Sequence, residues 1–142
     1  MNTKSKPNII VFFTDQQRWD TSSLHGNPLS LMENFDHYAV EGTHLYNSFT
    51  CQPVCGPARA SLQSGMYATK TGCFKNRIPL KKNIKTLAKY LSKEGYATGY
   101  IGKWHLGLGT GHVDWNTHIS PGPNEIGFDH AYIMAATQDR VP

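Results

Sequence analysis

Three polar clusters in this sequence could do chemistry, and the first is the segment CQPVCGPARASLQSG at residues 51–65. Its two cysteines, Cys51 and Cys55, are candidates for a disulfide, a metal site, a buried thiol or a nucleophile. A bridge between them is disfavoured, because Pro53 favours an extended chain that would hold the two Cα atoms roughly 13 Å apart, beyond the limit of about 7 Å. Cys73 makes the count odd, and no second Cys or His pair follows at zinc-site spacing. The pattern therefore favours separate thiols with separate roles.

The second cluster lies further along the chain and complements the first. If Pro57 takes the first position of a helix, Cys55 lies just outside the helix N-terminus, where free N–H groups and the helix dipole favour an anion. Arg59 can reach back with a forked donor suited to sulfate or phosphate oxygens. Lys103 and His105 follow an apolar run and, in an extended segment, point to the same side. These residues together predict an anion-binding pocket with a nucleophile candidate and a titratable base.

The third cluster, Asp15 and Gln16, ends the first apolar run of the chain. Their oxygen atoms suit a hard cation such as Ca²⁺ or Mg²⁺. Each residue also has a simpler explanation when taken alone. Asp15 could cap a turn, Gln16 could face solvent, Cys55 could be a small buried hydrophobe, and Lys103 and His105 could decorate the surface. Only the joint pattern favours a site.

The elements that must position these clusters alternate along the chain. Short apolar runs predict strands at 8–15, 43–50 and 96–102, and the first of them has the composition of a strand buried on both faces of a parallel sheet. Helical spacing, with a glycine that closes each helix at its C-terminal end, predicts helices at 32–42, 57–64 and 84–95. The glycine-rich and proline-rich stretch 107–124 predicts a long surface loop. Strands alternating with helices indicate an α/β sandwich around a mainly parallel sheet, where ligands gather at the carboxyl ends of strands.

Composition indicates an ordinary globular chain. Its 142 residues are 39% hydrophobic and 17% charged, with a net charge of +4. The lysines of KKNIKTLAK, residues 81–89, are interpreted as a solvated helix face, and nucleic acid is not expected as a partner. The apolar run Ile9–Phe13 is too short for a secretory h-region or a membrane span. The chain is therefore expected to be cytoplasmic and free of the membrane, or periplasmic or secreted if a leader has been removed.

Four motifs resemble those of a known family. CGPAR followed by ASLQSG resembles the signature of the type I, formylglycine-dependent sulfatases, in which cysteine, any residue, proline, a small residue and arginine follow one another. GYATGYIGKWHLG at 95–107 resembles their second signature, NIIVFFTDQQRWD their N-terminal metal-binding strand, and GFD at 127–129 a further marker. The resemblance runs from residue 7 to 130 and implies an alkaline-phosphatase-like α/β sandwich.

The resemblance implies a role for each matching residue of the catalytic site. Cys55 would be oxidised to formylglycine by a formylglycine-generating maturation enzyme, and its hydrated aldehyde would attack the sulfur of a sulfate ester. Arg59 would hold the formylglycine, Lys103 would bind the sulfate, and His105 would hydrogen-bond the diol and help to eliminate sulfate. By position, Cys51 is then a neighbouring structural thiol and Cys73 a packing residue.

The resemblance also implies a calcium site, with Mg²⁺ as an alternative, whose ligands are Asp15, Gln16 and the formylglycine from Cys55. Gln16 stands where many members carry a second aspartate. Members of the family run to several hundred residues, so 1–142 corresponds to the N-terminal part of the catalytic domain, with the remainder of the polypeptide as its partner. We expect 1–142 alone to be inactive and marginally stable.

The implied function is hydrolysis of a small-molecule or carbohydrate sulfate ester. A phosphonate or phosphate ester hydrolase of the same superfamily is the alternative, because such enzymes share the nucleophile and a similar metal site. A non-catalytic fragment that needs a missing remainder is the third possibility.

Overall fold

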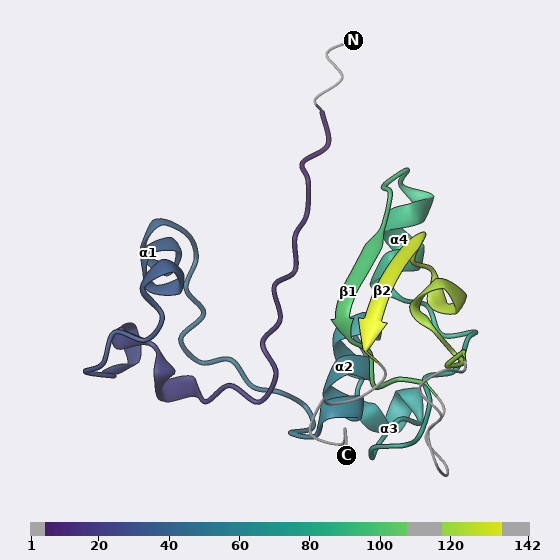
Figure 1. The fold of residues 1–142 in the computed structure, drawn as a ribbon, viewed down its shortest axis with the longest axis horizontal. Helices are drawn as coiled ribbons and strands as arrows, with labels where there is room; N and C mark the ends of the chain where they lie inside the picture. Colours follow the sequence, from purple (N-terminus) through teal and green to yellow (C-terminus); the bar gives the residue numbers. More distant parts are fainter. Residues whose placement is uncertain (1–4, 108–117, 135–142) are drawn as a thin grey trace. The chain divides into compact units, whose positions relative to one another are not determined.

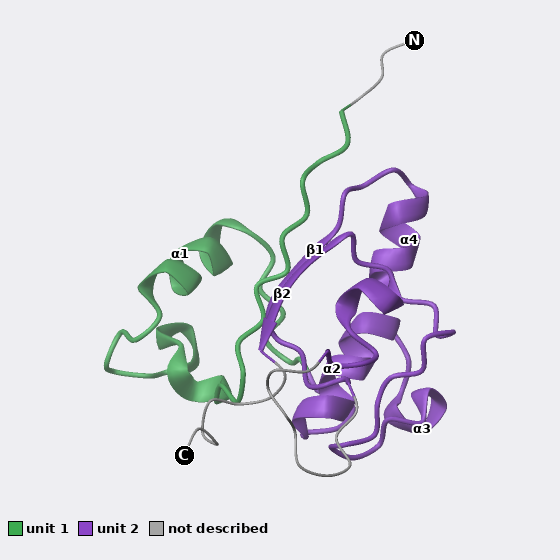
Figure 2. Ribbon diagram, turned by 45° about the vertical axis from the view of Figure 1, so that its right-hand side comes forward, with its two compact units in different colours: residues 1–48 green, residues 49–142 purple. Residues whose placement is uncertain are grey.

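The computed structural model describes residues 5–107 and 118–134 of the chain (Figure 1). It forms two compact units, unit 1 at residues 1–48 and unit 2 at residues 49–142 (Figure 2). Part of the loop expected at 107–124, residues 108–117, lies outside the described residues. None of the described helices is long and apolar enough to cross a membrane.

Unit 1 consists of short helices joined by irregular chain. The helices are η1 (Trp19–Thr21), η2 (Ser23–His25) and α1 (Glu33–Glu41). Helix α1 confirms the helix predicted at 32–42, and the N–H of Gly42 closes it on the Tyr38 carbonyl at 2.9 Å. The carboxylate of Asp36 connects α1 to η2, since it accepts hydrogen bonds from the Ser22 hydroxyl at 2.5 Å and the Ser23 N–H at 3.0 Å.

The strands predicted at 8–15 and 43–50 are absent from this part of the structure, so these two predictions are wrong for the described residues. Both segments lack regular secondary structure, and Ile10 and Phe12 are 89% and 90% exposed. The reason is that a strand, unlike a helix, takes its hydrogen bonds from another segment. An apolar run indicates a tendency to be buried, but it does not supply the neighbouring strand.

Unit 2 contains the regular α/β structure. Its described elements are α2 (Cys55–Ser64), α3 (Ala68–Thr71), α4 (Leu87–Lys93), β1 (Gly99–Lys103), η3 (Pro123–Ile126) and β2 (His130–Met134). The helices predicted at 57–64 and 84–95 and the strand predicted at 96–102 are confirmed with shifted ends. Strand β2 was not predicted.

Strands β1 and β2 lie side by side and run in the same direction (Figure 1), which confirms an α/β fold with parallel strands. Their register pairs Ile101 with Tyr132, and these two side chains are 83% and 82% exposed. Tyr100 and Ile133, on the other face, pack against the hydrophobic core. The sheet therefore has one covered face and one open face among the described residues.

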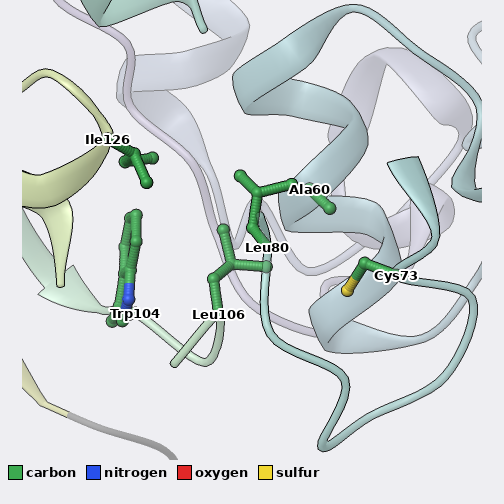
Figure 3. Packing of buried hydrophobic residues seen from close by; sticks show 6 residues of the cluster. All are labelled: Ala60, Cys73, Leu80, Trp104, Leu106 and Ile126. Atoms are coloured by element: carbon green, nitrogen blue, oxygen red, sulfur yellow. The ribbon is translucent and has the colours of Figure 1, made fainter. Parts of the chain in front are cut away.

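The core of unit 2 joins segments that are far apart in sequence (Figure 3). Its fully buried members are Ala60, Cys73, Leu80, Trp104, Leu106 and Ile126. Trp104 also donates its indole N–H to the Pro121 carbonyl at 2.7 Å, so its polar atom is satisfied inside the core. The burial of Cys73 confirms its prediction as a packing residue, and this burial raises the pKa of its thiol.

The GFD motif at 127–129 links α4 to the start of β1. The carboxylate of Asp129 accepts hydrogen bonds from the Thr98 N–H at 2.7 Å and the Thr98 hydroxyl at 3.0 Å. Gly127 has φ 117°, and a Cβ there would lie 3.0 Å from the backbone nitrogen of Lys89. Only glycine allows this close approach without strain. The motif therefore has a structural task in this fold.

Candidate active site

Cys55 is the first residue of α2 and is partly buried. The sequence predicted Pro57 at the first helical position, with Cys55 outside the helix, but the helix begins two residues earlier and Pro57 is its third residue. Proline is tolerated here because N–H groups of the first turn have no partner within the helix. The structure therefore places the sulfur of Cys55 on the first turn of the helix, at the positive end of its dipole.

Asn76 holds this first turn in place of an ordinary N-cap. Val54, at the N-cap position, makes no side-chain cap, whereas the N–H of Gly56 donates to Asn76 Oδ1 at 2.9 Å. A Cβ at Gly56 would lie 3.1 Å from Asn76 Oδ1 and 3.4 Å from the carbonyl oxygen of His105. The start of α2 is thus packed closely between the Asn76 side chain and the backbone of His105.

Sequence reasoning missed Asn76. It lies 20 residues after Gly56 in a loop, and no spacing rule connects the two positions. An asparagine in a turn is usually explained by bonds to its own backbone, so its type alone gave no signal.

Arg59 ties α2 to the carboxyl end of β1. The residue is 6% exposed, and its Nη1 donates to the Lys103 carbonyl at 2.8 Å and to the Tyr100 hydroxyl at 3.4 Å. Tyr100 in turn donates its hydroxyl to the same carbonyl at 2.5 Å. Arg59 lies one helical turn after Cys55, so both residues are on the same side of α2. The guanidinium thus brings a fixed positive charge and the end of β1 to the side of the helix that carries Cys55.

Lys103 is the last residue of β1 and His105 lies two residues beyond it, and the chain between them is not extended throughout. His105 has φ 53°, in the left-handed region, so the alternation expected of a strand stops there. This conformation costs a non-glycine residue on the order of 1–2 kcal/mol. It is maintained by buried neighbours on both sides, namely Trp104 and Leu106, whose carbonyl accepts the Leu80 N–H at 3.0 Å. Backbone strain of this kind is characteristic of functional sites.

Asp15 and Gln16 lie in unit 1, in a bend at the end of the exposed apolar segment. Gln16 has φ 55°, which is again left-handed. Carboxylate and amide oxygens fit a hard cation, but two ligands are only part of the six to eight that Ca²⁺ takes. Among the described residues, no three His, Cys, Asp or Glu side chains gather into a group that could hold a metal ion. The donor chemistry of Asp15 and Gln16 would thus fit calcium, and these two residues would supply only part of its shell.

The structure brings four of the six candidate residues together in unit 2, namely Cys55, Arg59, Lys103 and His105. The other two thiols have different surroundings. Cys51 is exposed and donates to the Ser61 hydroxyl at 2.9 Å, and Cys73 is in the core. All three cysteines are free. Cys55 is therefore the thiol that combines partial burial, a helix N-terminus and an adjacent buried arginine.

Curated relatives of this chain are sulfatases. It is 37% identical to an N-acetylgalactosamine-6-O-sulfatase of Bacteroides thetaiotaomicron over 96% of its length, and 32% identical to human arylsulfatase G over 94%. It spans only 28% and 25% of those two proteins. The chain therefore covers about a quarter of the length of the relatives it matches.

Solved structures give the same result. The crystal structure of Ps i-CgsB superposes on 94% of this chain with a TM-score of 0.76 and 29% identity, and the match covers 29% of that protein. A structure in complex with its substrate D-glucosamine-2-N,6-O-disulfate superposes on 72% of the chain with a TM-score of 0.69 and 33% identity, and the match covers 21% of that protein. Residues 7–141 match the family described as Sulfatase, and the chain belongs to the sulfatase family.

Proposed function

We propose that this chain carries the nucleophile of an enzyme that hydrolyses a sulfate ester, and that Cys55 is the precursor of a formylglycine. The observation that supports this most directly is the hydrogen bond from Arg59 Nη1 to the Lys103 carbonyl, 2.8 Å long. It joins the helix that begins with Cys55 to the end of β1 at Lys103, two residues before His105. Two cations, a titratable base and the nucleophile precursor thus belong to one packed unit.

Maturation would replace the thiol of Cys55 by an aldehyde. The residue loses its sulfur as hydrogen sulfide and gains one oxygen from water, a two-electron oxidation for which the maturation enzyme would supply the oxidant. The hydrated aldehyde would supply one hydroxyl that attacks sulfur and a second through which sulfate leaves. Placement on the first turn of α2 suits this group, since the N-terminal dipole stabilises the negative charge that develops there.

The remaining residues of the chain would act by charge and proton transfer. The ammonium of Lys103 would bind sulfate oxygens, and the imidazole of His105 would accept a proton from a hydroxyl of the diol. Arg59 would keep the end of β1 in place and contribute its positive charge. Asp15 and Gln16 would hold part of a Ca²⁺ shell, and that ion would offset charge on the sulfate.

A carbohydrate sulfate is the substrate class that we propose. A relative with 37% identity is named for a sulfated sugar, and a similar solved structure holds a glucosamine disulfate as its substrate.

Mass spectrometry tests the nucleophile. The full-length protein is produced beside a formylglycine-generating enzyme, and the peptide that spans 51–65 is sequenced. We expect a loss of about 18 Da at Cys55 and an unmodified Cys51. Cys55→Ala should abolish hydrolysis of glucosamine 6-sulfate, while the matched Cys51→Ala variant should retain it. Modification at Cys51 would refute the assignment, and faster turnover of a phosphonate monoester would favour the phosphonate hydrolase.

Metal removal tests the cation. Chelation should abolish hydrolysis by the matured full-length enzyme, and added Ca²⁺ should restore it. Asp15→Ala should lower activity by a factor of at least about 100, because the shell loses its carboxylate. Glu33→Ala changes an exposed carboxylate of α1 and serves as the matched control. Full activity in Asp15→Ala, or after exhaustive chelation, would contradict this role.

A further inference from the structure

One long segment of unit 2 contains many basic residues and no acidic ones. Residues 66–93 contain eight basic residues and no aspartate or glutamate. They are Lys70, Lys75, Arg77, Lys81, Lys82, Lys85, Lys89 and Lys93. None of the four candidate residues of unit 2 belongs to this segment, so the proposed catalytic site does not explain its charge.

Helix amphipathicity does not explain it either. The sequence interpretation assigned the lysines of 81–89 to a solvated helix face, but α4 begins only at Leu87. Lys70 is on α3, Lys89 and Lys93 are on α4, and the other five basic residues are in the loops between these helices. The charges are therefore not one polar face of an amphipathic helix.

These basic residues, here called the basic band, lie on one stretch of chain that runs from α3 to α4. Cys73 and Leu80 are both in the core, so the residues between them form a loop anchored at its two ends. At one end of this loop, Lys81 Nζ approaches within 4.0 Å of the position a Cβ would take at Gly72, just after α3. On the other side, Lys89 Nζ donates to the Ile84 carbonyl at 2.8 Å and to the Lys82 carbonyl. The basic residues thus follow one another from α3 to α4.

Most of this charge faces water. Seven of the eight side chains are exposed and Lys89 is half-buried. Lys82 forms an ion pair with Glu125, which offsets one charge. Lysine dominates the set, and an ammonium group is a mobile point charge without the fixed fork of arginine. Such a surface suits an extended anion with many charged groups better than a single small ligand.

We infer that this basic band, residues 70–93, binds a sulfated polysaccharide chain beyond the sugar whose ester is hydrolysed. The identity of the polyanion rests on the proposed function, since a substrate polymer with repeated sulfate groups complements repeated ammonium groups. Binding of this kind releases counterions from the polymer, so it weakens steeply as the salt concentration rises.

The test measures binding of dextran sulfate to the full-length protein at several NaCl concentrations, with uncharged dextran as the ligand control. In one variant Lys75, Lys85 and Lys93 are changed together to Gln, and in the matched control the same three are changed to Arg. We expect the Gln variant to bind at least about tenfold more weakly at low salt, with a shallower salt dependence. The Arg variant should bind like the wild type, and both variants should melt like the wild type.

Unchanged binding in the Gln variant would overturn the inference, as would equal binding of uncharged dextran. Tighter binding of duplex DNA, with no competition by dextran sulfate, would assign the band to nucleic acid instead. Hydrolysis of 4-nitrophenyl sulfate separates this inference from the proposed function. The Gln variant should hydrolyse that small ester within about twofold of the wild-type rate. If the wild type binds dextran sulfate but does not hydrolyse the ester, the proposed function is refuted and the binding inference still holds.

Discussion

Unit 1 and unit 2, which Figure 2 colours separately, use their apolar residues in opposite ways. In unit 2, segments from Ala60 to Ile126 converge on a fully buried core. In unit 1, the apolar run Ile9–Phe13 is exposed. Its helices are connected instead by polar contacts and by aromatic rings, such as Trp19 stacked on His25 at 4.0 Å.

The difference shows that hydrophobic sequence produces a core only where later elements return to cover it. Core formation in unit 2 depends on contacts across long separations, as between Arg59 and Lys103. The polar contacts of unit 1, such as Ser22 with Asp36, connect closer residues. We therefore expect unit 2 to contribute most of the folding free energy, because burial of apolar area is its main source.

The largest difference between the two units should come from Trp104, the largest side chain in the core of unit 2. Trp104→Ala should lower the free energy of unfolding by about 3–5 kcal/mol, because it leaves a cavity in the core of unit 2. Phe12→Ala, at a side chain that is 90% exposed, should change it by less than about 0.5 kcal/mol. Urea denaturation of the full-length protein measures both values. Equal losses would mean that Phe12 is buried in solution.

Removal of the buried guanidinium of Arg59 should have the next largest effect on stability. Arg59→Met should cost about 1–3 kcal/mol, because the Lys103 carbonyl loses one of its two donors and the Tyr100 hydroxyl loses the donor that it accepts from. The comparison in unit 1 is Arg18→Met, which breaks an exposed pair with Asp20 and should have a much smaller effect. Hydrogen exchange of the Trp104 amide should speed up only in Arg59→Met. The idea that Arg59 anchors this strand would fail if exchange accelerated equally in both variants.

The Asn76 side chain should stabilise unit 2 by about as much as an ordinary helix cap does. Asn76→Ala should destabilise unit 2 by about 1 kcal/mol, since the Gly56 N–H loses its acceptor. Asn76→Asp keeps an acceptor oxygen at the helix N-terminus and should retain most of the stability. Thermal melting of the two variants provides the comparison, and identical melting temperatures for Asn76→Ala and wild type would rule out this capping role.

Acid should lower the stability of both units, by less than the substitutions above. A hydrogen bond from Lys82 is the main cause that lowers the pKa of Glu125 in unit 2 from 4.5 to about 2. A pKa lowered by folding contributes stability above the unfolded value, and that contribution is lost as pH falls from 4.5 towards 2. In unit 1, the hydrogen bond from Ser22 likewise lowers the pKa of Asp36. Melting curves between pH 2 and 6 should lose part of their acid dependence in Glu125→Gln, and an unaltered dependence would exclude this carboxylate as a contributor.

Local features of the fold could be predicted because they depend on neighbouring residues. Helix α2 and its end at Gly65, in the left-handed conformation at φ 67°, follow from spacing and from the freedom of glycine. Helix α1 and strand β1 follow in the same way. The positions of Cys55 and Arg59 on one side of α2 required only the helical repeat.

Features that depend on distant partners could not be predicted. Strand β2 exists because β1 supplies its hydrogen bonds, with Ile101 opposite Tyr132. Asn76 reaches Gly56 across 20 residues, and no local pattern signals that contact. The left-handed backbone of His105 likewise arises from packing on both sides of it.

The sequence by itself determined the family, the residue types of the site and the helices that carry them, because motifs and periodicity act over a few residues. Tertiary structure alone decided that the guanidinium of Arg59 meets the end of β1 and that Trp104, not the apolar run of unit 1, forms a core. The physical reason is that burial and strand pairing are properties of two segments at once. A single segment can carry the tendency, but its partner decides the outcome.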